Sequence, residues 1–251
     1  LNLVAGQKAL DENAYEAAKA YFDTGLRQLA NLDLDEDALD LPLLLGSAKA
    51  ACSLGQWEPM AERIEQVVAV SRSVLDAIPA YELQIEAAHA KNQLSDGIEI
   101  TLSTLTALGF EFPSHPEPDV IGEALTSTAQ MVAQHSPDEI FALPEMRSPT
   151  ALAVMRLINA IITPCFSARP MLLPVVVTAQ IRLAIAEGNT PDAAYAYGIY
   201  GLILSGIVGD LASSYSMGQL SRRLLAKYQA SGQIESLRAR TQHVLYAFVD
   251  H

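Results

Sequence analysis

The chain has 251 residues, of which 50% are hydrophobic and 18% are charged, so it can bury a sizeable core and is not intrinsically disordered. Its net charge of -13 disfavours nucleic acid as the main partner, because phosphate binding needs clustered Lys and Arg side chains. Aromatic residues make up only 6% of the chain, and the many alanines and leucines favour close-packed helices over a β-sandwich.

The first part of the chain repeats itself in the manner of tetratricopeptide (TPR) repeats, in which two antiparallel helices fill about 34 residues. Three frames align, offset by 42 and then by 37 residues, and each predicts a helix–turn–helix hairpin. The first frame contains Gly6, Ala9, Asn13, Tyr15, Ala18, Phe22 and Gly25. The second contains Leu44, Ala48, Ala51, Gly55, Trp57, Met60, Ile64 and Val67. The third contains Tyr81, Ile85, Ala88, Asn92, Leu94, Gly97, Thr101 and Thr104.

Residue size assigns packing roles within these frames. Small residues such as Ala18 and Gly97 let helices approach closely, and the larger Tyr15, Phe22, Trp57 and Ile64 fill the gaps between them. One apolar stripe continues from Ile64 to Ile78, which predicts a single helix that runs to Pro79.

The repeat is interrupted after about residue 109. Three prolines between 113 and 118 predict an extended connector. Helix signals resume from about Asp119 to Gln134, and Ser136 predicts the cap of a short helix that ends before Pro144. Ser148 opens a helix through Ile162, and prolines predict an interruption near 164–171. The segment 143–149 is interpreted as a packing element, with a docking element as the alternative.

Hairpins return in the last part of the chain. We expect helices at 172–186, from Thr190 to about Ile207, from Leu211 to about Tyr228, and from Ile234 to at least Val249. The uncharged run 193–209 is too short and too rich in glycine for a membrane span, so a buried helix is predicted. The expected fold is an all-α, right-handed superhelix of TPR type with a proline-broken helical insert. Its parts are N-terminal hairpins at 1–109, connector and insert helices at 110–171, and C-terminal hairpins at 172–251 of one continuous solenoid.

Motifs for chemistry are missing from the sequence. It has no phosphate-binding loop, dinucleotide fingerprint, nucleophile elbow or zinc-hydrolase motif, so no catalytic, cofactor-binding or metal-binding residue and no cofactor are predicted. Cys52 and Cys165 have apolar neighbours, which indicates buried thiols in a reducing cytoplasm. Tyr195, Tyr200 and Tyr215 lie near several glycines and could line a small-molecule pocket, but helix packing is the preferred interpretation.

Several short segments together resemble the helical-repeat region of very large bacterial multidomain signalling ATPases. They are 1–9, 14–18, 81–85, 108–113, 143–146, 200–204 and 208–210. The resemblance implies a parent protein with a serine/threonine-kinase-like domain, an AAA/STAND-type ATPase, a GAF-type sensor and a histidine kinase, of which this chain is a piece. None of the kinase or ATPase motifs lies in these residues.

The expected function follows from the repeats and the resemblance together. The chain is predicted to be a non-catalytic regulatory scaffold in the cytoplasm that does not span a membrane. Its partners would be the neighbouring kinase, ATPase and sensor domains or another protein, and not nucleic acid. The alternative is a domain that senses a small ligand, an inducer, for a STAND-type ATPase.

Overall fold

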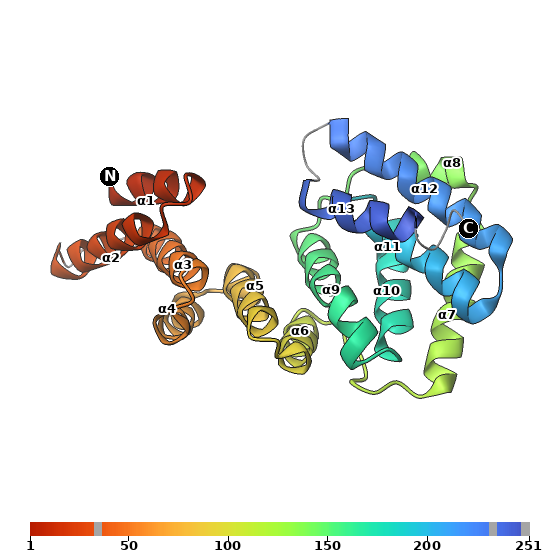
Figure 1. Ribbon diagram of the computed structural model, residues 1–251, viewed down its shortest axis with the longest axis horizontal. Helices are drawn as coiled ribbons and strands as arrows, with labels where there is room; N and C mark the ends of the chain where they lie inside the picture. The colour runs from red at the N-terminus through yellow and green to blue at the C-terminus, as the bar shows by residue number, and fades with distance from the viewer. Residues whose placement is uncertain (33–36, 231–234, 247–251) are drawn as a thin grey trace. The chain divides into compact units, whose positions relative to one another are not determined.

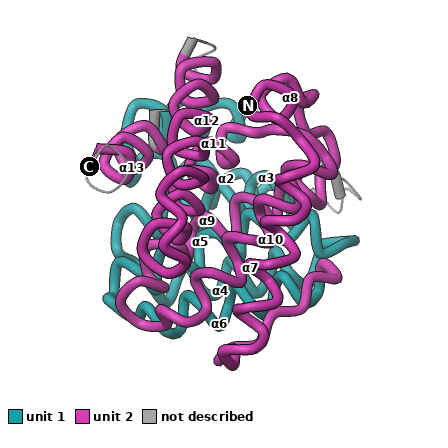
Figure 2. Tube along the Cα trace, turned by 90° about the vertical axis from the view of Figure 1, so that its right-hand side faces the viewer, with its two compact units in different colours: residues 1–107 teal, residues 108–251 magenta. Residues whose placement is uncertain are grey.

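Helices make up the regular structure of the chain, and the all-α prediction is confirmed. The computed structural model describes residues 1–32, 37–230 and 235–246. Within these ranges it contains thirteen α-helices, one π-helical segment and an isolated bridge between Glu145 and Asn189, but no strand (Figure 1). The chain divides into two compact units, residues 1–107 and 108–251, which Figure 2 distinguishes by colour. The three-part division expected from the sequence stays a prediction.

The first unit consists of three helix–turn–helix pairs. Each helix packs against the one that follows it in the chain, and α3 also contacts α1 and α5. The helices are α1 (Asn2–Asp11), α2 (Tyr15–Leu32), α3 (Asp37–Ser53), α4 (Trp57–Val70), α5 (Val74–Ala90) and α6 (Leu94–Ala107).

The three turns inside these pairs have the same backbone geometry. Asn13, Gly55 and Asn92 each adopt a left-handed conformation, with φ of 59°, 67° and 57°. In each turn this residue and the next donate backbone hydrogen bonds of 2.8–3.0 Å to carbonyls three and five positions earlier. This is the Schellman closure of a helix, which Gly and Asn form at least cost. The turn residues are 42 and then 37 positions apart, as the repeat frames predict.

Buried positions recur in register with these turns. An alanine four positions before each turn residue is buried, and so are the residues five, nine and twelve positions after it. The alanines are Ala9, Ala51 and Ala88. The later positions hold Ala18, Phe22 and Gly25 in the first pair, Met60, Ile64 and Val67 in the second, and Gly97, Thr101 and Thr104 in the third.

The helix expected to run from Ile64 to Pro79 is in fact two helices. Helix α4 ends at Val70, and the Ser73 hydroxyl caps α5 by accepting a 3.3 Å hydrogen bond from the Asp76 amide. Pro79 lies inside α5 and is exposed. The prediction was wrong because Ile64 and Ile78, which belong to different helices, are both buried and so continue one apolar pattern across the break.

The second unit has helices that cross one another rather than follow a strict chain order. Helix α11 contacts α9, α10, α12 and α13, while α7 packs against α10 and α8 against α12. The helices are α7 (Pro118–Val132), α8 (Pro137–Phe141), α9 (Pro149–Ala168), α10 (Leu172–Glu187), α11 (Pro191–Ile203), the π-helical segment η1 (Leu204–Val208), α12 (Leu211–Ala230) and α13 (Glu235–Val244).

Helix α9 is longer than the sequence predicts, since it continues beyond Ile162. The expected interruption is present at 169–171, but its predicted start at residue 164 is wrong, because α9 continues to Ala168 with Pro164 inside it. Pro164 and Cys165 are both buried, so apolar packing outweighs the one backbone hydrogen bond that proline cannot make. By length and composition α9 could cross a membrane, but 61% of its most apolar stretch is buried inside the structure, as in a core helix.

The segment 143–149 packs against the turn that precedes α11. Asn189 donates its amide to the Pro144 carbonyl at 2.8 Å and accepts from the Met146 amide at 3.0 Å. Its side chain donates to the Ile140 carbonyl at 2.7 Å, and Met146 is 5% exposed. The neighbouring Gly188 has a φ of 109°, and a Cβ atom there would meet the Pro144 carbonyl oxygen. This geometry makes the segment a packing element that holds α8 to the start of α11.

Candidate functional site

The predicted tyrosines lie on two helices with different environments. Helix α11 is buried from Ala193 to Gly201, and Tyr195 and Tyr200 are 3% and 1% exposed. Tyr215 on α12 is instead 58% exposed. The close approach of α11 and α12 explains why residue 201 is a glycine, since a Cβ atom there would lie 3.1 Å from the Ser214 carbonyl oxygen.

Tyr195 lines a groove of about 530 Å³ between α9, α11 and α13, which we call the Tyr195 groove. Burial raises the pKa of Tyr195, and its hydrogen bond with Thr163 and the charge of Arg240 offset only part of this effect. The phenol is therefore protonated at neutral pH. The lining residues are Thr163, Phe166, Tyr195, Leu202, Ala239, Arg240, His243 and Val244.

Tyr200 lines a second groove, of about 550 Å³, between α7, the end of α11 with η1, and α12. We call it the Tyr200 groove. It is mostly apolar, and its titratable side chains besides Tyr200 are His135 and Asp210. The Asp210 carboxylate accepts a 3.0 Å hydrogen bond from the Ser213 amide, so it caps α12. Tyr215 lines neither groove, and the three predicted tyrosines do not share one site.

The predicted repeat-packing residues fall into two groups. Ala18, Phe22, Ile64 and Gly97 are buried. Tyr15 and Trp57 are half-buried and pack against the apolar clusters of α1–α3 and α3–α5. The Lys91 ammonium lies 5.9 Å from the centre of the Trp57 ring.

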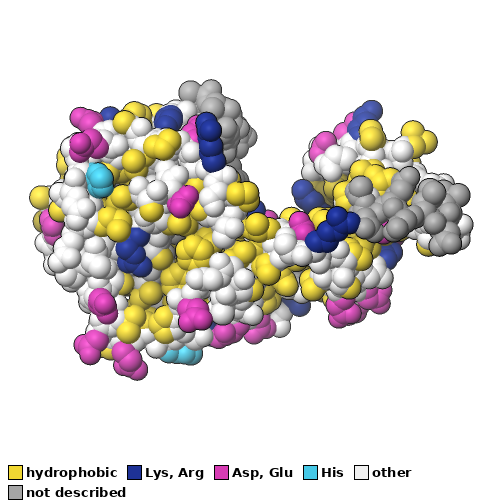
Figure 3. All heavy atoms as spheres, turned by 180° about the vertical axis from the view of Figure 1, so that it is seen from behind, with side chains coloured by type: hydrophobic (Ala, Val, Ile, Leu, Met, Phe, Trp, Pro, Cys, Tyr) yellow, Lys and Arg dark blue, Asp and Glu magenta, His cyan; other side chains and the backbone are white. Residues whose placement is uncertain are grey.

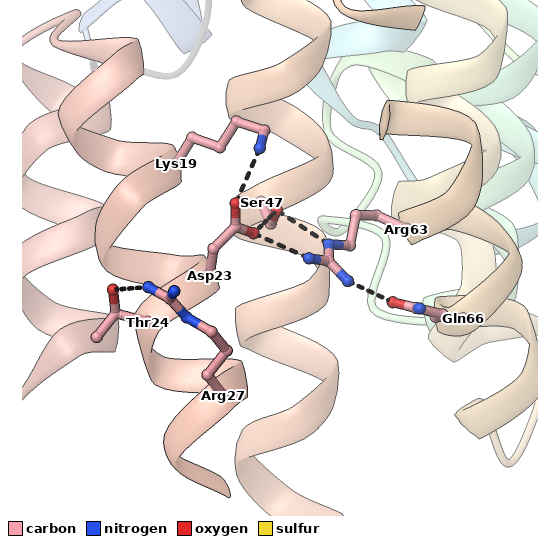
Figure 4. Close-up of polar contacts among 7 residues, drawn as sticks. All are labelled: Lys19, Asp23, Thr24, Arg27, Ser47, Arg63 and Gln66. Atoms are coloured by element: carbon pink, nitrogen blue, oxygen red, sulfur yellow. Dashed lines mark hydrogen bonds and ion pairs between the residues drawn. The ribbon is translucent and has the colours of Figure 1, made fainter. Parts of the chain in front are cut away.

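A polar network that the sequence interpretation missed joins α2, α3 and α4 in the first unit (Figure 4). The Asp23 carboxylate accepts hydrogen bonds from Lys19 at 2.8 Å, from Ser47 at 2.7 Å and from Arg63 at 3.1 Å. Lys19 and Arg63 also form ion pairs with it. Two partners of Asp23, Ser47 and Arg63, come from the neighbouring helices α3 and α4, so only tertiary structure reveals the network.

The charge of Asp23 depends on this network. Burial raises the pKa of Asp23, but hydrogen bonds from Lys19 and Ser47 and the charges of Lys19 and Arg63 lower it by more, so the pKa lies below its ordinary value. A carboxylate with a depressed pKa stabilises the fold above the pKa of the unfolded chain. That stabilisation is lost as the pH falls through the folded-state pKa.

We therefore expect Asp23→Asn to lower the free energy of unfolding by about 1–2 kcal/mol at neutral pH, since the bonds are partly open to solvent. The difference from the unchanged protein should shrink as the pH falls toward and below the pKa of Asp23. Urea titrations followed by Trp57 fluorescence at several pH values measure it. Glu62→Gln, at an exposed position of α4, is the control, and an equal effect of both changes would contradict the role of the network.

Reactive and metal-binding groups are not assembled in the part of the chain that the structure describes. Among these residues no group of three or more His, Cys, Asp or Glu side chains could hold a metal ion. Cys52 and Cys165 are free and buried, and burial raises their pKa to about 11 and about 12. Both are therefore protonated and poorly nucleophilic at neutral pH.

Sequence reasoning also missed a series of hydrogen-bonded polar side chains in the second unit. Gln180 on α10 donates to the Asn159 side chain at 2.9 Å, and Asn159 on α9 donates to the Asp192 carboxylate at 2.7 Å. The available signal was a polar residue inside an otherwise apolar helix, because a buried amide needs a partner. These hydrogen bonds link α9 and α10 to the start of α11.

Comparisons with protein-family models, with curated proteins and with solved structures find no match to the chain. The resemblance to the signalling ATPases, which rests on short segments, therefore stays a prediction. What supports a function is the geometry of the repeated pairs, the grooves and the exposed surface.

Proposed function

We propose that the chain is a non-catalytic regulatory scaffold built of TPR-like repeats, arranged as a right-handed superhelix. It makes contacts with neighbouring kinase, ATPase and sensor domains of a cytoplasmic signal-transduction kinase, or with a separate protein partner. It binds no nucleic acid and does not span a membrane. Any ATP-dependent phosphotransfer belongs to other domains of the same polypeptide.

The observation that carries this proposal is the recurrence in the first unit. Three pairs close through the same left-handed turn, and they bury residues at the same positions relative to it. Repeated pairs that pack on their neighbours build elongated surfaces, and such surfaces are suited to binding other proteins.

Two surfaces are available for contacts. In the first unit, a groove of about 420 Å³ runs along the first helix of each pair, with lining residues from α1, α3 and α5. Its apolar lining is accompanied by Lys49, Glu82 and Glu86, so a partner could be recognised by charge as well as by apolar contact. In the second unit, Figure 3 shows hydrophobic side chains gathered over the middle of one face, with most acidic side chains toward its rim. Contiguous apolar surface of this kind marks contact sites.

Cross-linking mass spectrometry of the full-length protein that contains this chain tests the proposal. We expect cross-links from the first helices of the pairs to another domain or to a co-purified protein, and we expect Lys49→Glu with Glu86→Lys to weaken them. Glu62→Lys on α4 lies outside the groove and is the matched control. Absence of cross-links, or equal loss in the control, would overturn the proposal.

A second function, the binding of a small ligand, is favoured by one observation. Tyr195 and Tyr200 each line a groove of the second unit whose volume lies in the range of small-molecule sites, roughly 300–1,000 Å³. A bound inducer would rest on helices that surround α11. It would then change how the second unit presents its surface.

A further inference from the structure

The two grooves of the second unit differ in the charges that line them. Asp210 and Tyr200 both line the Tyr200 groove; burial raises the pKa of Tyr200, and the charge of Asp210 raises it further. The Tyr195 groove is lined by Arg240 and His243 and by no Asp or Glu. In a chain with a net charge of -13, a groove lined by Arg240 and by no acidic side chain among the described residues departs from the general character of the surface.

Arg240 provides the charge that this groove can offer to a ligand. Among the residues that the structure describes, no acidic side chain forms an ion pair with it. Although burial raises the pKa of Tyr195 by more, the positive charge of Arg240 lowers that pKa, and the Tyr195 side chain is hydrogen-bonded to Thr163. The groove lining therefore combines a guanidinium group with two hydroxyl groups.

The remaining lining of the groove is apolar. Phe166, Leu202, Ala239 and Val244 contribute it from α9, α11 and α13. Phe166 is 46% exposed, so much of its aromatic surface in this groove is left uncovered. A ligand that matched both parts would have an anionic group and an apolar body.

We propose that the Tyr195 groove binds a small amphipathic carboxylate, with its carboxylate group on Arg240 and its apolar body against Phe166 and Leu202. This inference rests on the second proposed function, the binding of a small ligand. The guanidinium group matches a carboxylate through two parallel hydrogen bonds. A phosphate group, which carries more charge, calls for more than one such partner, so a single arginine without an acidic partner among the described residues favours the carboxylate.

Calorimetric titration of the 251-residue chain with three ten-carbon probes tests the charge requirement. The probes are decanoate, decanol and decylammonium, each below the concentration at which it self-associates. We expect decanoate to bind about tenfold more tightly than decanol, because a charged hydrogen-bonded pair is added to the same apolar contact. Decylammonium should bind more weakly than decanol.

Variants then locate the site. Arg240→Gln should weaken decanoate binding about tenfold and leave decanol binding unchanged. Arg238→Gln removes the same charge from an exposed position of the same helix outside the groove, and it should leave both affinities within about twofold. Ala239→Phe should prevent binding of both probes by filling the groove, and melting curves of all variants confirm that they fold.

The outcomes separate the two proposals. Equal affinities for decanoate and decanol, both abolished by Ala239→Phe, would preserve ligand binding but overturn the carboxylate assignment. Equal losses with Arg240→Gln and Arg238→Gln would show attraction to the helix as a whole and overturn the site. If none of the probes binds, both the groove and its ligand class are wrong.

Discussion

Replacement of Gly188 by alanine is expected to destabilise the second unit by about 3–4 kcal/mol. Gly188 has φ 109° and ψ 173°, a combination that side chains with a Cβ atom essentially never adopt. The added Cβ would also meet the Pro144 carbonyl oxygen, which accepts a hydrogen bond from the Asn189 amide. The three atoms nearest to the added methyl group are backbone atoms of Pro144 and Met146, so it has no flexible side chain to displace there.

Gly209→Ala is the matched control, because Gly209 has a φ of 79° and no atom within 4 Å of the Cβ it would gain. It therefore isolates the conformational cost, about 1 kcal/mol. The difference between the two variants measures the contact with the 143–149 segment together with the more restricted backbone conformation of Gly188. Chemical denaturation followed by circular dichroism gives the stabilities, and hydrogen exchange should show lost protection at the Asn189 and Met146 amides. Equal effects of both variants would mean that the 143–149 segment moves away from the added methyl group at little cost, which would contradict the prediction.

The turns of the first unit could be predicted from the sequence because their cause is local. Asn13, Gly55 and Asn92 are residue types that adopt positive φ at low cost, and each follows a run with helical periodicity. Buried positions of the second helices then follow from the 3.6-residue period. The same reasoning located α8, since Ser136 and Glu139 form a reciprocal cap over one turn.

The sequence did not predict that Pro79 and Pro164 lie inside helices, because this depends on long-range packing. Pro79 and Pro164 lie inside helices whose neighbouring residues are buried by other parts of their own unit. The candidate site was found only in part for the same reason. Tyr195 attracted notice as one of several tyrosines near glycines, whereas Arg240 comes to line the same groove only when α13 packs on α11.

The second large effect is expected at Phe22 in the first unit. Its ring is 1% exposed and lies between Gly6 of α1 and Gly46 of α3. A Cβ at Gly6 or Gly46 would approach the Phe22 ring to 2.6 Å or 2.5 Å, so both glycines are small because the ring occupies their space. Phe22→Ala should cost about 3–5 kcal/mol through lost burial and the cavity left behind.

A double-mutant cycle makes this interpretation specific. Gly46→Ala alone should cost about 1–3 kcal/mol, because a rigid ring already fills the site. In the Phe22→Ala background the same change should be neutral or stabilising, since it fills part of the cavity and alanine favours the helix by about 0.5–1 kcal/mol. The coupling free energy should therefore exceed about 1 kcal/mol.

Trp57, the chain's only tryptophan, lies in the first unit and reports these stabilities by fluorescence. Gly122→Ala supplies the reference for helix propensity alone, because Gly122 is an exposed glycine of α7 with no atom within 4 Å of its missing Cβ. Because Gly122 lies in the second unit, its effect is measured by circular dichroism; it should stabilise that unit slightly and show no coupling to Phe22. Additive effects of Phe22→Ala and Gly46→Ala would contradict the packing of the Phe22 ring against Gly46. They would also contradict the close approach of α1, α2 and α3 on which the first repeat depends.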